Sequence, residues 1–127
     1  MGKKILVVDD EPEQIDFASA VLEENGYTPI SATDGLEGMR MVKAEKPDLV
    51  LLDIIMPEKG GISMYRDLKG DEGTKNIPVI IVTGVTRGER FEEQMIRKDP
   101  ELPLPDGYIE KPMKTDALLK LIGELLS

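Results

Sequence analysis

The sequence predicts an α/β fold: a doubly wound, five-stranded parallel sheet with helices on both faces. Two observations lead to this prediction. Three short runs, at residues 5–8, 49–52 and 79–82, are apolar without interruption, which is typical of strands buried on both faces of a parallel sheet. The segments between them carry apolar residues at helical spacing. Strands that alternate with helices fold through right-handed crossovers into one parallel sheet.

The first helix is predicted to begin near Pro12, because proline is favoured at a helix start, and to stop before Gly26. Its apolar face consists of Ile15, Ala18 and Leu22. A short second strand is expected at residues 28–31, directly after this helix. These two elements complete the first β-α unit and begin the second one.

The second helix repeats the apolar pattern with Leu36, Met39 and Val42, and Pro47 closes this unit. A weaker helix is predicted over residues 62–69, between the second and third apolar runs. The third apolar run ends at residue 82, and four strands and three helices are predicted up to that point.

The last third of the chain should hold a helix from about residue 88 to 98 and a short strand at 107–109. The stretch DPELPLPDG, residues 99–107, is predicted to be an irregular loop because its three prolines cannot continue a helix. The final helix is marked by apolar residues at helical spacing: Leu118, Leu119, Ile122, Leu125 and Leu126.

Composition excludes several classes of function. The chain has 127 residues, enough for one domain, and 25 acidic against 16 basic residues give it a net charge of −9. This charge argues against nucleic acid or an anionic membrane surface as the partner. The chain contains no cysteine and no histidine, which excludes disulfides, thiolate or imidazole zinc sites and a histidine base. No segment is apolar for long enough to span a bilayer, and we expect a soluble cytoplasmic protein.

Polar residues follow the predicted strands at the edge where a site is expected. Asp9 and Asp10 follow the first apolar run, Asp53 the second and Thr83 the third, and Lys111 comes soon after the last short strand. In open α/β sheets, ligands bind outside the carboxyl ends of the strands. We therefore expect these side chains to meet at one edge of the sheet.

This set of side chains suits phosphoryl transfer. Three neighbouring carboxylates repel one another unless a cation is bound, and Mg²⁺ prefers such oxygen ligands. A carboxylate can also act as a nucleophile toward phosphorus. In this interpretation Asp53 is the nucleophile, Asp9 and Asp10 hold the metal, and Lys111 and Thr83 receive the phosphoryl oxygens.

Each of these residues also has a purely structural interpretation. Asp9 and Asp10 suit the start of a helix, whose dipole favours negative charge. Asp53 suits a turn before Pro57, and a lysine that precedes a proline is usually a solvated loop residue. Only their joint occurrence at successive strand ends favours a functional site.

Four stretches carry a resemblance to a known family: ILVVDDEP, PDLVLLDIIMP, IPVIIVTG and GYIEKP. In this order they resemble the receiver domain of response regulators in two-component signalling, and the resemblance covers essentially the whole chain, residues 1–127. It implies a flavodoxin-like sheet with strand order 2-1-3-4-5. It also implies a single receiver domain, with no output domain in this chain.

The resemblance implies a role for each matching residue. Asp53 would be the phosphoacceptor. The Mg²⁺ ligands would be Asp10, Asp53 and the backbone carbonyl of Ile55, with Asp9 acting through water. The phosphoryl group would be contacted by Thr83, the backbone amide of Gly84 and Lys111. Thr83 and Tyr108 would form the conformational switch, and the bond before Pro112 would be cis.

The implied function is a switch that accepts a phosphoryl group from a histidine kinase or a phosphotransfer protein and then docks on an unknown downstream protein. Such a protein is not an enzyme in the usual sense, since it only promotes its own phosphorylation and dephosphorylation. A degenerate receiver that only binds partners, or one module of a longer kinase or regulator, remain alternatives. A haloacid-dehalogenase-like phosphatase needs an aspartate at position 55, and a flavodoxin-like FMN carrier would not place two aspartates at its phosphate loop.

Two departures from the family pattern lead to expectations of their own. Ile55 and Val85, two residues after Asp53 and Thr83, have no hydrogen-bonding side chain. We therefore expect slow self-dephosphorylation, because neither side chain can orient a water molecule. Thr83 and Lys111 are 28 positions apart, more than the family usually has, and the extra residues fall in the stretch 99–107.

Overall fold

The computed structural model of the chain describes residues 2–54, 61–83 and 103–126. The strands are β1 (Lys4–Val8), β2 (Thr28–Ala32), β3 (Leu49–Asp53), β4 (Val79–Thr83) and β5 (Gly107–Glu110). The helices are α1 (Pro12–Glu24), α2 (Gly35–Glu45), α3 (Gly61–Gly70) and α5 (Thr115–Leu126). All neighbouring strands pair in parallel, in the order β2-β1-β3-β4-β5, which confirms the predicted fold class.

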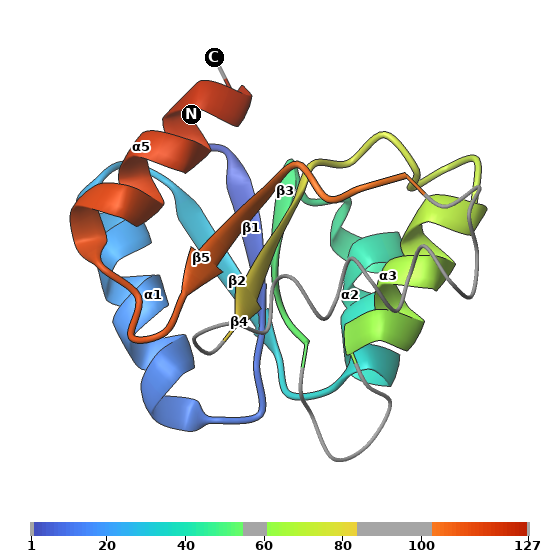
Figure 1. Cartoon of the computed structure of the whole chain (residues 1–127), viewed down its shortest axis with the longest axis horizontal. Coiled ribbons are helices and arrows are strands. Elements are labelled where there is room, and N and C mark those ends of the chain that lie inside the picture. The colour runs from blue at the N-terminus through green and yellow to red at the C-terminus, as the bar shows by residue number, and fades with distance from the viewer. Residues whose placement is uncertain (1, 55–60, 84–102, 127) are drawn as a thin grey trace.

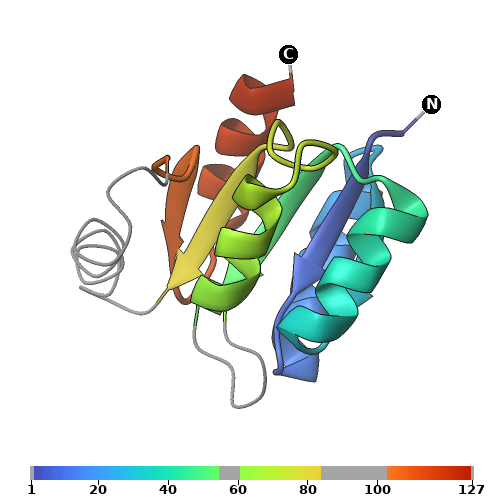
Figure 2. The same cartoon turned by 90° about the vertical axis from the view of Figure 1, so that its right-hand side faces the viewer.

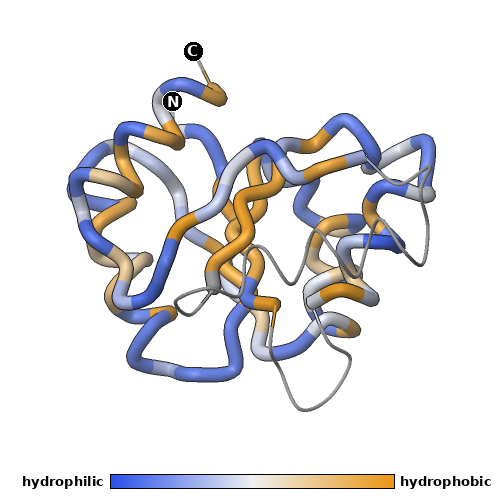
Figure 3. Tube along the Cα trace, viewed as in Figure 1, coloured by the Kyte–Doolittle hydropathy of each residue, from blue (hydrophilic) through white to orange (hydrophobic). Residues whose placement is uncertain are grey.

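The molecule has three layers. Helices α1 and α5 cover one face of the sheet and α2 and α3 cover the other, as Figures 1 and 2 show from two directions. Side chains alternate between the faces along each strand. In β1, Leu6 and Val8 belong to the core beneath α2 and α3, whereas Ile5 and Val7 belong to the core beneath α1 and α5. The central strands are therefore apolar on both faces, and they are mostly orange, the colour of hydrophobic residues, in Figure 3.

The apolar face of α2 matches the prediction at Val42, which is buried, and at Met39, which packs against the core, but not at Leu36. Leu36 was expected in the core but is 59% exposed, while the buried residues of this helix are Gly35, Gly38 and Val42. Gly38 explains the rotation of the helix, because a Cβ at this position would lie 2.8 Å from the sulfur of Met64 in α3. Close packing of α2 on α3 through this glycine turns Leu36 toward the surface.

The other helices follow the expected patterns. Ala18 and Leu22 of α1 are fully buried, and Ile15 packs against the same core. In α5, Leu118 and Ile122 are fully buried. The helix expected from residue 88 to 98 lies outside the described residues. No helix in the described ranges is both long and apolar enough to cross a membrane.

The segment that leads into β5, residues 103–106, is non-helical and lies against α3 and the start of β4. Its anchor is the buried Tyr65, whose hydroxyl donates a 2.6 Å hydrogen bond to the carbonyl of Pro103. Asp106 adds two bonds to Val79: its carboxylate accepts from the Val79 amide at 2.9 Å, and its own amide donates to the Val79 carbonyl at 3.0 Å. The described part of the predicted irregular loop is therefore irregular and also held in place, while residues 99–102 lie outside the description.

Lys69 supports the same anchor from a buried position. Its side chain is 7% exposed, lies 3.9 Å from the carboxylate of Asp106 and donates to two backbone carbonyl groups before β4, each at 3.1 Å. Burial lowers the pKa of Lys69, and the negative charge of Asp106 partly opposes this change. The lysine thus joins α3, β4 and the segment before β5.

We expect Tyr65→Phe to lower the free energy of unfolding by about 1 kcal/mol, because the fully buried hydroxyl loses its bond to Pro103. Urea unfolding measures this change. The matched control is Tyr27→Phe, since the hydroxyl of Tyr27 makes no hydrogen bond among the described residues and its loss should change stability less. Equal effects of the two substitutions would contradict the anchoring role.

The same substitution should change the pH dependence of stability. Burial is the main cause that raises the pKa of Tyr65 above its ordinary value, and the negative charge of Asp106 raises it further. In the unfolded chain a tyrosine ionises near pH ~10, so the contribution of Tyr65 to stability is complete below that pH and is lost as the pH rises further. Wild type should therefore lose more stability above pH ~10 than Tyr65→Phe, as measured by urea unfolding across this range.

Candidate functional site

The carboxyl ends of β1, β3 and β5 bring charged side chains together at one edge of the sheet. Asp53 is the last residue of β3, Asp9 directly follows β1, and Lys111 directly follows β5. The alternation of side chains along a strand puts Asp9 on the same face as Val7, and Asp53 on the same face as Leu51. Both residues thus lie at the end of the core beneath α1 and α5.

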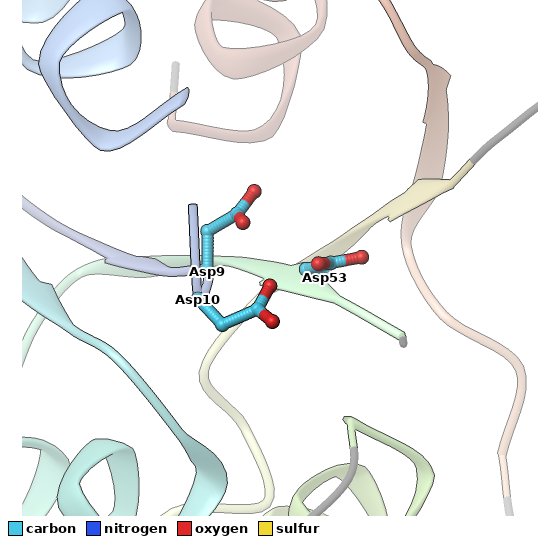
Figure 4. Close-up of side chains that lie close together, drawn as sticks. All are labelled: Asp9, Asp10 and Asp53. Atoms are coloured by element: carbon cyan, nitrogen blue, oxygen red, sulfur yellow. The ribbon is translucent and has the colours of Figure 1, made fainter. Parts of the chain in front are cut away.

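Three carboxylates form a compact cluster, as predicted from the strand ends. One oxygen each of Asp9, Asp10 and Asp53 lies within 4.8 Å of the others. Figure 4 shows these side chains, two from the segment after β1 and one from the end of β3. Asp9 and Asp53 are only 2% and 5% exposed, whereas Asp10 is half-buried. Carboxylates so close together favour a bound cation, and oxygen ligands at a partly open edge suit Mg²⁺.

Lys111 supplies the positive charge in this cluster. Its ammonium nitrogen lies 3.2 Å from a carboxylate oxygen of Asp9, 3.4 Å from one of Asp53 and 3.1 Å from one of Glu11. Burial alone would lower the pKa of Lys111, but the neighbouring carboxylates, Asp53 foremost, outweigh it and raise this pKa. The lysine is therefore held in its charged form beside the expected phosphoacceptor.

Backbone contacts hold the cluster in position. The amide of Asp9 donates to the carbonyl of Ala32, which continues the pairing of β1 with β2, and the Asp9 carboxylate accepts from the amide of Glu11 at 2.9 Å. On the β3 side, a Cβ at Gly61 would overlap the carbonyl oxygen of Asp53 and lie 2.6 Å from the Cα of Ile54. A side chain at position 61 would thus displace the end of β3.

Several expected site residues are described incompletely or not at all by the structure. Thr83 ends β4, and its backbone is in register with Glu110 of β5; its side chain is outside the description. Ile55, Gly84 and Val85 lie outside the described residues, so the roles expected for them, and slow dephosphorylation, stay predictions.

Two further expectations concern β5 and the residues after it. Tyr108 is half-buried and packs against the core beneath α2 and α3. The bond between Lys111 and Pro112 is cis, as the resemblance implied. The switch role of Tyr108 stays a prediction.

The sequence did not point to Glu11 as part of the site. Its side chain reaches Lys111 across 100 positions of the chain. The only sequence signal was its place directly after Asp9 and Asp10. An acidic residue at the start of a helix is common for other reasons, so this signal did not distinguish it.

Comparisons with known proteins agree with this geometry. A family model of the response regulator receiver domain matches residues 5–123. Protein PilH of Pseudomonas aeruginosa is 36% identical over 124 residues, which cover 98% of this chain and 98% of PilH. The polar-differentiation response regulator DivK of Brucella anthropi is 30% identical over 126 residues, covering 99% of this chain and 98% of DivK.

Solved structures give the same result. The receiver domain of a signal transduction histidine kinase from Syntrophus aciditrophicus matches with a TM-score of 0.82 and 32% identity, covering 98% of this chain and 90% of that one. The chemotaxis response regulator CheY4 of Vibrio cholerae, at 24% identity, shares the fold with a TM-score of 0.85 over 99% of this chain and all of CheY4. From the family match and these relatives, we conclude that the chain belongs to the response regulator receiver domains of two-component signalling.

Proposed function

We propose that the protein is a phosphorylation-controlled switch in which Asp53 accepts a phosphoryl group from a histidine kinase or a histidine phosphotransfer protein. The observation that carries this proposal is the surroundings of Asp53: two further carboxylates within 4.8 Å and an ammonium group at 3.4 Å, at the end of a central strand. A degenerate receiver would have no need to keep this combination of charges.

The transfer step follows from the chemistry of these groups. A carboxylate oxygen of Asp53 attacks the phosphorus of a phosphohistidine, the new O–P bond forms as the P–N bond breaks, and the electron pair of that bond returns to the donor imidazole. Lys111, which is held charged, offsets negative charge on the phosphoryl oxygens. Thr83 is proposed to donate its hydroxyl to one of these oxygens.

Asp9, Asp10 and Asp53 are the side chains proposed to hold Mg²⁺, together with the backbone carbonyl of Ile55. When bound, Mg²⁺ neutralises the carboxylates and the incoming phosphoryl oxygens, which otherwise repel one another. Lys111 contacts Asp9 and Asp53, so the lysine and the metal would share these two carboxylates. Asp10 makes no ion pair with the lysine among the described residues, so it is the carboxylate most available to the metal.

The proposed output is a change in binding to a downstream protein. Phosphorylation adds about −1.5 to −2 charges and three acceptor oxygens at Asp53. Thr83, at the end of β4, pairs in register with Glu110 of β5. The half-buried Tyr108 lies two residues earlier in the same strand. A phosphoryl group that attracts Thr83 would favour an inward position of Tyr108 and need only shift two existing states by a few kcal/mol.

The direct test is the intact mass of the protein after incubation with acetyl phosphate and Mg²⁺. We expect the mass to increase by one phosphoryl group with Mg²⁺ and to stay unchanged when EDTA replaces Mg²⁺ in the incubation. A mass that stays unchanged with Mg²⁺ would favour the degenerate receiver, and a mass gain that survives EDTA would contradict the proposed metal dependence.

A further inference from the structure

Glu11 has an unusual position for a residue at the start of a helix. It is the N-cap of α1, and its carbonyl accepts from the amides of Gln14 and Ile15. Side chains at this position commonly cap the helix amides, yet the side chain of Glu11 makes no such bond. Its carboxylate instead lies 3.1 Å from the ammonium nitrogen of Lys111.

The backbone of Glu11 is held beside the acidic cluster by a hydrogen bond. Its amide donates to the carboxylate of Asp9 at 2.9 Å, so the residue is tied to the acidic cluster as well as to the helix. The three carboxylates around Lys111 differ in exposure: the side chains of Asp9 and Asp53 are 3% and 7% exposed, whereas that of Glu11 is 60% exposed. Glu11 is thus the partner that water can replace at the lowest cost.

We propose that Glu11 is a positioning residue that holds Lys111 in the unphosphorylated protein and competes with the phosphoryl group for it. This inference rests on the proposed function of Asp53. An ammonium group has three donors, and three carboxylates surround it here. A phosphoryl oxygen on Asp53 gains a bond to Lys111 only when another partner leaves, and the exposed Glu11 is the one that leaves. Its negative charge also repels the incoming dianion.

Glu11→Gln should therefore bind the phosphoryl analogue beryllofluoride about two- to fivefold more tightly than wild type, the range expected for an exposed ion pair. Calorimetric titration with beryllofluoride in saturating Mg²⁺ measures this affinity. A separate Mg²⁺ titration without the anion should give an unchanged or slightly weaker metal affinity. This split between anion and metal distinguishes competition for Lys111 from a general effect on the site.

Glu13→Gln is the matched control, because Glu13 is an exposed glutamate in the first turn of the same helix and its replacement removes the same charge. It should bind beryllofluoride as wild type does. Equal affinities of the Glu11 and Glu13 variants would overturn the proposal, as would weaker anion binding by Glu11→Gln. A large loss of Mg²⁺ affinity in that variant would make Glu11 a metal ligand and would also overturn it.

A second measurement tests the contact when no phosphoryl analogue is bound. In EDTA, the melting temperatures of Glu11→Gln, Lys111→Met and the double variant should be non-additive by about one to four degrees, because the two side chains interact directly. Additive shifts would overturn the proposal. If wild type binds no beryllofluoride at all, the proposed function of Asp53 fails, and a non-additive result still establishes the pair.

Discussion

Asp53→Asn is expected to abolish phosphorylation by acetyl phosphate. The substitution keeps the size of the side chain, but a neutral amide is not the nucleophile that a carboxylate is. Asp53 is buried at the end of β3 with Lys111 beside it. Intact-protein mass in the presence of Mg²⁺ should show one added phosphoryl group in wild type and none in the variant.

The control for this substitution is Asp16→Asn, which changes an exposed aspartate of α1 in the same chemical way. It should be phosphorylated like wild type. Thermal melting of both variants establishes that they are folded. Undiminished phosphorylation of a folded Asp53→Asn protein would place the phosphoacceptor at another residue and contradict the assigned site.

Lys111→Met is expected to uncouple metal binding from anion binding. The lysine contacts three carboxylates and has no acceptor atom with which to bind a metal. Without the lysine, beryllofluoride affinity should fall about ten- to a hundredfold. This range corresponds to the loss of one hydrogen bond to a charged group, which contributes about 1.5–3 kcal/mol. Mg²⁺ affinity should stay the same or rise, since a competing positive charge has left Asp9 and Asp53.

Two titrations measure these effects, one with Mg²⁺ alone and one with beryllofluoride in saturating Mg²⁺. Lys114→Met is a suitable control because Lys114 is an exposed lysine three positions away, and it should match wild type in both titrations. Lower metal affinity together with a preserved anion response in Lys111→Met would reverse the roles assigned here.

Much of the fold was predictable from the sequence because it depends on local patterns. Continuous apolar runs such as Leu49–Leu52 are typical of strands covered on both faces, and the order of strands and helices then allows few topologies. The candidate site followed from the same reasoning, since parallel strands end at one edge of the sheet. Asp9, Asp10 and Asp53 were expected together for this reason, and their carboxylates meet within 4.8 Å.

The rotation of α2 was not predictable in this way. Leu36, Met39 and Val42 have helical spacing, but the same helix has a second possible face with Gly35 and Gly38. The choice between them depends on how closely α2 approaches α3. The tight fit of Gly38 against Met64 decides it and leaves Leu36 exposed.

The sequence by itself therefore determined the fold class, the strand ends and the acidic cluster, because each depends on the period of apolar residues or on what directly follows a strand. Only the tertiary structure decided the partners of long side chains. The contact of Glu11 with Lys111 joins residues 100 positions apart, and that of Tyr65 with Pro103 joins residues 38 positions apart. Such contacts depend on the relative placement of helices and loops, which no local pattern encodes.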